Sequence, residues 1–137
     1  MPKPPLPAEL EEFLAQPNPS VIATLDADAN PHTAATWYLW EDGRVLVNMD
    51  EGRRRLGYIR DDPRVSITVL GGGDDWYHHV TLRGRVVELD EEGLDDIDRI
   101  SRHYTGQPYS RRDRGRVSAW IEVESWHSWA VNQPWAA

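Results

Sequence analysis

The chain has 137 residues, a length typical of one domain, and its 39% hydrophobic content supplies one modest core rather than two. With 15 basic and 23 acidic residues, its formal net charge is −8, which argues against general binding to nucleic acid. The absence of cysteine excludes disulfides, thiolate catalysis and zinc–sulfur or iron–sulfur sites. The single lysine, Lys3, lies in a proline-rich segment, so we expect no Schiff-base or P-loop lysine chemistry.

No apolar run approaches the roughly 18 residues that a membrane span needs. The first ten residues lack the apolar stretch of a signal peptide. We therefore expect a cytoplasmic protein that binds neither membranes nor nucleic acid. We expect one domain over residues 1–137, in which 1–7 form an extended N-terminal arm.

The first half of the chain predicts one short helix followed by three strands. Apolar residues recur at helical spacing over 8–16, before two prolines. The strand segments are apolar, rich in β-branched or aromatic residues and bounded by turn-forming residues; they are 20–25, 32–40 and 45–49. The Asp42-Gly43 pair is typical of a hairpin. We expect residues 20–49 to form a three-stranded antiparallel meander.

The second half predicts helices inserted between further strands. The expected helices are 50–61 and 91–104, and the expected strands are 64–70, 76–89 and 116–123. The first helix has to end before Asp62, because a residue that precedes proline disfavours the α region. Gly84 predicts a bulge within its strand. Six antiparallel strands with a few small helices indicate an α+β, mainly β fold that closes as a small barrel.

The strongest functional signal is the run Arg53-Arg54-Arg55, at a strand-to-helix junction. A helix N-terminus offers free backbone N–H groups, and guanidinium groups add fixed donors for phosphate or carboxylate. Three adjacent arginines in an acidic protein therefore predict an anionic ligand. The alternative is a solvated face with ion pairs to Asp50, Glu51 or Asp61. Successive helical residues point about 100° apart, so we do not expect all three arginines to reach one ligand.

A second candidate is the aromatic run at residues 76–79. Within a strand, Trp76 and His78 would share one face. The glycine-rich segment 71–75 before them would let Trp76 act as a lid over a flat ring. The alternative for Trp76 is packing in the core or in a dimer interface. We expect no metal site, because adjacent histidines in a strand diverge.

The third candidate is the strand that contains Ala34 and Ala35, whose small side chains would let a ligand ring approach closely. Thr33, Thr36 and Tyr38 would offer polar contacts there, although ordinary strand composition is the favoured explanation of the segment taken by itself. Neither a Gly-x-Ser-x-Gly elbow nor a Gly-x-Gly-x-x-Gly loop occurs in the chain. Hydrolase and dinucleotide-binding functions therefore have no support in the sequence.

Taken in order, these motifs resemble a known family. The motifs are 20–25 with Asn30-Pro31-His32, Trp37-Tyr38, Asp42-Gly43-Arg44, the arginine run, the segment 60–66 and the strand from Trp76 to Gly84. Over roughly residues 8–125 this order resembles the pyridoxamine 5′-phosphate oxidase-like split β-barrel proteins. Within them it is most similar to the actinobacterial flavin/deazaflavin oxidoreductases of the B type, which bind coenzyme F420.

The resemblance implies a six-stranded antiparallel split β-barrel that forms a homodimer, with two cofactor sites at the subunit interface. It implies that Arg53 and Arg55 hold the cofactor phosphate, with a lesser part for Arg54. The other implied cofactor-binding residues are Asn48, Met49 and Asp50 beside the rings, Thr33, Thr36 and Trp37 on the facing strand, Tyr58, and Trp76 approaching from the partner subunit. Arg55, Tyr58 and Ala35 depart from the residues common in relatives, and the last two leave FMN as an alternative cofactor.

We therefore expect an oxidoreductase in which reduced F420 delivers a hydride to an unsaturated small organic substrate, while the protein supplies orientation and a dry site. If a side chain protonates the product, the candidates are Tyr38 and His78. The arginines also suit the acidic oligoglutamate tail of F420. Arg60 and Arg64 would extend that basic track, but the favoured alternative for these two is a role as surface salt-bridge partners. The alternatives are an FMN-dependent oxidase or reductase, a non-catalytic cofactor- or haem-binding protein, and a dimeric scaffold. The candidate haem ligands are His32, His78 and His79, none of which the sequence selects.

Overall fold

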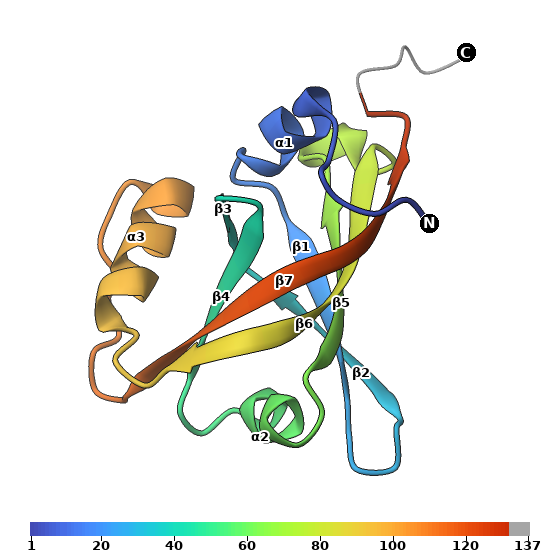
Figure 1. The fold of residues 1–137 in the computed structure, drawn as a ribbon. Helices are drawn as coiled ribbons and strands as arrows, with labels where there is room; N and C mark the ends of the chain where they lie inside the picture. The colour runs from blue at the N-terminus through green and yellow to red at the C-terminus, as the bar shows by residue number, and fades with distance from the viewer. Residues whose placement is uncertain (132–137) are drawn as a thin grey trace.

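The structure, a computed structural model, describes residues 1–131 and is built on one strongly curled antiparallel sheet of seven strands (Figure 1). The strands are β1 (Ser20–Leu25), β2 (Pro31–Thr36), β3 (Leu39–Glu41), β4 (Arg44–Asp50), β5 (Arg64–Leu70), β6 (His79–Asp90) and β7 (Arg116–Trp129). The helices are α1 (Ala8–Leu14), α2 (Arg54–Asp61) and α3 (Leu94–Thr105), with a 3-10 turn η1 (Gly73–Asp75). The predicted α+β, mainly β class is confirmed, with seven strands in place of six.

The predicted meander is wrong, because the single strand expected over 32–40 is two strands at opposite edges of the sheet. The strand order is β2-β1-β5-β6-β7-β4-β3, so β2 pairs with β1 and β3 pairs with β4. The chain crosses between the edges at Trp37 and Tyr38. Tyr38 is buried at this crossing, and its hydroxyl donates to the carbonyl oxygens of Leu14 and Gln16, at 2.7 and 3.1 Å. These long-range contacts outweigh the local strand preference of the segment.

The core fills the inside of the curled sheet. Along β5, Val65, Ile67 and Val69 are buried while their neighbours are not, because side chains alternate between the faces of a strand. α1 buries Leu10 and Leu14 in the same core. The helices otherwise cover separate parts of the sheet: α1 contacts β3, α2 contacts β1 and α3 contacts β7.

The N-terminal segment 1–7 is docked on the sheet. The backbone N–H of Trp126 in β7 donates to the carbonyl of Pro2 at 2.9 Å, and its indole N–H donates to the carbonyl of Lys3 at 3.3 Å. Leu6 adds a buried side chain to the core. The arm therefore runs beside β7, where Figure 1 shows the N-terminus.

β6 and β7 form the long central pair of the sheet. β7 extends to Trp129, well beyond the predicted end at residue 123, because it pairs with β6 as far as His79. The predicted bulge at Gly84 is confirmed by a shift of register between Arg83 and Gly84. The last of the tryptophans, Trp135, lies outside the described residues.

Two helices position the candidate site. α2 ends at Asp61 before Asp62-Pro63, as the sequence predicts, but it begins at Arg54 and not at residue 50, because β4 continues to Asp50. α3 buries Ile97 and Ile100 against Leu46 of β4 in a small apolar cluster of its own. No helix within residues 1–131 combines the length and the apolar character needed to cross a lipid bilayer.

Candidate functional site

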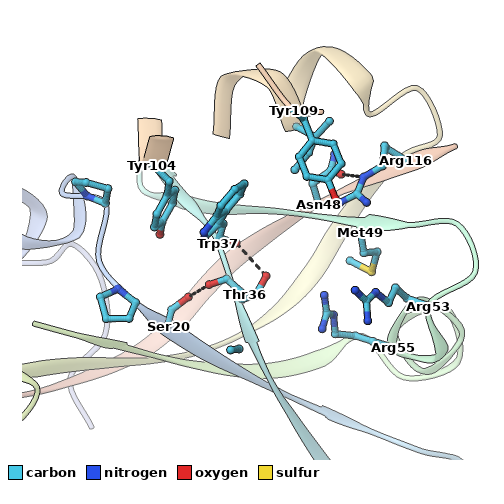
Figure 2. Close-up of a pocket in the computed structure, with 14 residues that line it drawn as sticks. Ser20, Thr36, Trp37, Asn48, Met49, Arg53, Arg55, Tyr104, Tyr109 and Arg116 are labelled. Atoms are coloured by element: carbon cyan, nitrogen blue, oxygen red, sulfur yellow. Dashed lines mark hydrogen bonds between the residues drawn. The ribbon is translucent and has the colours of Figure 1, made fainter. Parts of the chain in front are cut away.

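A cavity of about 590 Å³ lies where the crossing segment after β2 meets β4, α2 and α3 (Figure 2). Its lining residues come from six separate parts of the chain; they are Pro17, Pro19, Ser20, Ala35, Thr36, Trp37, Asn48, Met49, Arg53, Arg55, Ile97, Tyr104, Tyr109 and Arg116. This volume falls in the range of about 300 to 1,000 Å³ that is usual for small-molecule and cofactor sites. We call this space the main cavity.

Aromatic rings form one wall of the main cavity. Trp37 stacks on Tyr104, with ring centroids 5.2 Å apart and an interplanar angle of 13°, and Tyr109 meets Trp37 edge-on. The Tyr104 hydroxyl donates to the carbonyl of Asn18 at 2.7 Å, which fixes the ring. Burial raises the pKa of Tyr104 to about 12, so this hydroxyl stays protonated at neutral pH. The wall therefore offers a rigid indole to a flat ligand.

Cationic groups gather at the other end of the main cavity, where Figure 2 shows Arg53 and Arg55 below Met49. The Nε atom of Arg55 is buried and has no hydrogen-bond partner among the described residues. Burial, and then repulsion from Arg53 and Arg116, lowers the pKa of Arg55. No carboxylate in residues 1–131 lies within ion-pair distance of these three arginines.

A buried guanidinium N–H without a partner costs free energy, and a bound anion that accepts from it removes that cost. The start of α2 adds to the attraction. Arg53 occupies the position just before the helix, and no side chain caps it there. The first N–H groups of α2 and the positive end of its dipole are therefore left to a ligand. The interpretation of the arginine run as a solvated, salt-bridged surface does not fit Arg55, whereas Arg53 is exposed but makes no ion pair within the described chain.

Thr33, Arg54 and Tyr58 lie in a smaller groove of about 300 Å³ beside the main cavity. Arg53 and Arg55 line both spaces, so the two adjoin at the arginines. The remaining lining residues of this groove are Thr24, His32 and Ala34. The three arginines thus divide as their helical spacing predicts, with Arg54 facing only the smaller groove.

Four predicted site residues line neither space: Tyr38, Asp50, Trp76 and His78. Asp50 points to Arg114 instead, with 3.1 Å between Oδ2 and Nε. Its pKa is lowered, first by the backbone N–H of Gly52 at 2.7 Å and then by nearby arginines. We expected Asp50 to line the cavity beside Asn48 and Met49, and this prediction is wrong.

Residues 76–78 precede β6 and are not part of it, so the expectation that Trp76 and His78 share a strand face is wrong. They follow η1, in the connection that lies near α1 in Figure 1. Trp76 has 64% of its surface exposed, whereas the Nε2 atom of His78 is buried without a hydrogen-bond partner among the described residues. Within a single chain, neither residue reaches the main cavity.

Tyr38 cannot act as an acid toward a ligand in the main cavity. Only 1% of its surface is exposed, and its hydroxyl proton is committed to the backbone carbonyls at the end of α1. Burial raises its pKa far above the usual value, which removes it further from proton transfer. Its role as a proton donor is therefore corrected to that of an anchor for the crossing between β2 and β3.

Replacing Tyr38 with phenylalanine should destabilise the protein without impairing its site. The buried carbonyl of Leu14 and the partly buried carbonyl of Gln16 lose their donor, so we expect the free energy of unfolding to fall by about 1–3 kcal/mol. Urea denaturation of the wild type and of Tyr38→Phe measures this loss, and ligand titration measures the site. A variant of unchanged stability that no longer supports turnover would restore Tyr38 as a catalytic candidate.

The candidate haem ligands do not converge. His32 Nε2 lies 2.8 Å from Asp26 Oδ2, and His79 Nδ1 bonds to the carbonyl of Tyr77 at 2.9 Å. His32 lines the smaller groove, and none of His32, His78 and His79 lines the main cavity. Within the described part of the chain, no three histidine, aspartate or glutamate side chains gather as a metal site.

Sequence reasoning missed several lining residues because they are distant along the chain. They include Tyr104 of α3, Tyr109 of the segment after α3, and Arg116, the first residue of β7. Residues 111–116 contain several arginines, and the sequence does not distinguish Arg116, which alone among them lines a cavity described above. Its Nε–H donates to Asn48 Oδ1 at 2.9 Å, which is the dashed contact at the upper right of Figure 2.

Solved structures of similar fold include one named F420 reductase, with a TM-score of 0.80 and 20% identity, covering 89% of this chain and 98% of that one. The conserved hypothetical protein Rv2991 from Mycobacterium tuberculosis has a TM-score of 0.73 and 25% identity, and the match covers 98% of this chain and 92% of that protein. HupZ from Group A Streptococcus has a TM-score of 0.66 and 18% identity, and the match covers 97% of this chain and 100% of that protein. No curated protein matches the chain.

A comparison with family models agrees with the fold and extends over nearly the whole described chain. The model described as pyridoxamine 5′-phosphate oxidase matches residues 6–130. The matched span includes every strand and helix and all the lining residues of the main cavity. The resemblance read from the order of motifs is thereby confirmed at the level of the family, and the chain belongs to the pyridoxamine 5′-phosphate oxidase family.

Proposed function

We propose that the protein is an oxidoreductase that binds coenzyme F420 in the main cavity and acts on an unsaturated small organic substrate. The observation that carries this proposal is the half-buried guanidinium of Arg55, whose buried Nε has no hydrogen-bond partner and which makes no ion pair within the described chain. It lies beside Arg53, in a cavity whose opposite wall is the indole of Trp37. A flat ring system that carries a phosphate matches both ends of the cavity, because the rings would lie against the indole and the phosphate would lie against the arginines.

The residues present fit such a cofactor. Arg53 and Arg55 would hold the phosphate together with the N–H groups at the start of α2. Trp37 and Met49 would lie against the rings, since both line the space between the arginines and the aromatic wall. When bound in its reduced form, F420 supplies a hydride, and the protein contributes binding and orientation.

The polar side chains of the ring-binding region are already oriented. Ser20 Oγ donates to the carbonyl of Thr36 at 2.6 Å, and Thr36 Oγ1 donates to the carbonyl of Trp37 at 3.0 Å. Each hydroxyl proton is thus committed, which leaves the oxygen as an acceptor for a ring N–H. Pro17, Pro19 and Ile97 add apolar lining to the same space.

Two observations favour F420 over FMN as the cofactor. The smaller groove adjoins the main cavity at Arg53 and Arg55 and adds Arg54, so a cationic surface continues beyond the phosphate position. F420 carries an acidic tail that would follow this surface, whereas FMN ends at its phosphate. In addition, one structure of similar fold is named F420 reductase. Arg60 and Arg64 do not extend the track, because they pair with Glu91 and Asp62.

The active form in this proposal is a cytoplasmic homodimer with a cofactor site at the subunit interface. Trp76 and Trp129 are large apolar side chains with 64% and 52% of their surfaces exposed. β2 is an edge strand, and Pro31, His32 and Thr33 at its start are exposed. Exposed tryptophan and an exposed sheet edge are features that association between subunits covers. Trp76 would then reach a cofactor held by the partner subunit.

Titration of the purified protein with F420, FMN and haem tests the cofactor assignment. We expect F420 to quench tryptophan fluorescence saturably, because its rings would stack near Trp37. Trp37→Phe is the matched variant: it should lose a large share of the quenching while equilibrium dialysis still detects the cofactor. Saturable binding of FMN or haem without any response to F420 would refute the assignment of F420.

A further inference from the structure

Arg116 is a third cationic group of the main cavity, and it comes from a different part of the fold than the arginine run. It opens β7, whereas Arg53 and Arg55 belong to the start of α2. Figure 2 shows the side chain of Met49 between Arg116 and the other two arginines. Arg116 therefore faces the same cavity from another side.

The Arg116 side chain is held in place by neutral groups. Its Nε–H donates to Asn48 Oδ1 at 2.9 Å, and its guanidinium carbon lies 4.8 Å from the centre of the Tyr109 ring. These contacts use Nε and one face of the guanidinium group. The two terminal nitrogens make no hydrogen bond or ion pair within residues 1–131, so their fork remains for a ligand.

Asn48 is itself fixed by a buried network. Its Nδ2 atom donates to the carbonyl of Gly93 at 2.8 Å and to Ser118 Oγ at 3.1 Å, and Ser118 Oγ donates to Asp96 Oδ2 at 2.7 Å. A Cβ atom on Gly93 would lie 2.7 Å from Asn48 Nδ2, so the close approach requires glycine. The network thus orients Arg116 through an amide and without a direct ion pair, although the Asp50 carboxylate, which pairs with Arg114, also attracts Arg116.

The three arginines that line the main cavity leave positive charge for more than one anion, because Asp50, the carboxylate that attracts Arg53 and Arg116, pairs with Arg114 and does not line the cavity. A phosphodiester carries one negative charge, and Arg53 and Arg55 already exceed it. Arg116 adds a third positive charge, close enough to contribute to the lowered pKa of Arg55. A second anionic group beside Arg116 would offset this repulsion, because oppositely charged groups stabilise each other more strongly where water is excluded.

We propose that Arg116, held by Asn48 and Tyr109, is a second anion subsite of the main cavity that binds a carboxylate of the substrate. The enzyme would then prefer unsaturated organic acids to their neutral analogues. A terminal guanidinium fork matches the two oxygens of a carboxylate, and the adjacent ring of Tyr109 suits a conjugated chain beside it. The proposal rests on the proposed function, since it assigns Arg53 and Arg55 to the cofactor.

A pair of isosteric probes tests the subsite: trans-cinnamate, which is an acid, and cinnamamide, which is neutral. Binding of each is measured by tryptophan fluorescence on cofactor-saturated protein, for the wild type, Arg116→Ala and Arg111→Ala. Arg111 is an exposed arginine of the same segment and lines neither cavity, so it controls for net charge. We expect Arg116→Ala to weaken cinnamate about tenfold or more and to leave cinnamamide unchanged, as the loss of a charge-assisted hydrogen bond predicts.

Arg111→Ala should bind both probes as the wild type does. Arg116→Lys, which keeps the charge but loses the fork, should retain part of the preference for cinnamate; this second variant covers the case in which Arg116→Ala folds poorly. The proposal is overturned if the wild type does not prefer cinnamate to cinnamamide, or if Arg116→Ala weakens both probes equally. It is also overturned if Arg116→Ala loses the cofactor as strongly as Arg53→Ala does, because Arg116 would then belong to the phosphate site.

The probe titrations, repeated on cofactor-free protein and combined with the cofactor titration described above, separate the two proposals. If no cofactor binds but Arg116→Ala still selectively loses cinnamate, the carboxylate subsite stands and the proposed function fails. If cofactor binds normally and cinnamate shows no dependence on Arg116, the proposed function stands and the subsite fails.

Discussion

Replacing Arg53 and Arg55 together with alanine is expected to weaken binding of the phosphate-bearing cofactor by about 100-fold or more. Each arginine contributes charge-assisted hydrogen bonds worth roughly 1.5–3 kcal/mol, and about 1.4 kcal/mol corresponds to a tenfold change in affinity. The cavity should retain residual affinity through Trp37 and Met49, which line the space for the rings. Fluorescence titration of the double variant against the wild type measures the loss.

Arg60→Ala is the matched control within the same helix. Arg60 lies at the other end of α2 and pairs with Glu91 at 2.6 Å, so its removal should leave cofactor affinity unchanged. Arg54→Ala distinguishes the cofactors, since Arg54 faces only the smaller groove. This substitution should lower the affinity for F420, which carries the acidic tail, more than the affinity for FMN. Equal affinity of the double variant and the wild type would refute the assignment of Arg53 and Arg55 to the phosphate.

The double variant should not lose stability in the absence of cofactor. Arg55 is half-buried with an unpartnered Nε, and Arg53 and Arg116 repel it. Removing such a group relieves an unfavourable interaction, so the midpoint of thermal unfolding should stay at or above that of the wild type. A residue that binds a ligand at the expense of stability is typical of a functional site.

Gly84→Ala is expected to produce the largest loss of stability among single substitutions of glycine. A Cβ atom on Gly84 would collide with the backbone carbonyl of Glu122 in β7. β6 and β7 each pair with a further strand on their other side, so neither can move away without breaking another ladder. We expect a loss of about 3 kcal/mol or more in the free energy of unfolding, at the upper end of overpacking effects. The corresponding fall in the unfolding midpoint is about 10 °C.

Gly57→Ala supplies the control for Gly84→Ala. Gly57 lies within α2, and a Cβ atom there meets nothing within 4 Å. Alanine in place of a helical glycine usually stabilises by about 0.5–1 kcal/mol. Thermal and urea unfolding of the two variants should therefore shift in opposite directions. A Gly84→Ala protein as stable as the wild type would show that the bulge at this position tolerates a side chain.

The sequence by itself determined the features that depend on neighbouring residues. The end of α2 before Asp62 follows from the proline after it, because the proline ring restricts the preceding residue. The bulge at Gly84 and the hairpin at Asp42-Gly43 follow from the conformations that glycine adopts easily. The arginine run predicted an anion-binding position, because charge and helix polarity are local properties.

Only the tertiary structure decided how distant segments meet. The division of 32–40 into β2 and β3 depends on the burial of Tyr38 against the end of α1, which no local preference encodes. The same crossing brings Trp37 onto Tyr104, and the pairing of β4 with β7 brings Asn48 to Arg116. The free energy that selects these contacts comes from packing and hydrogen bonding between residues far apart in the chain, and periodicity or composition does not record which distant partners meet.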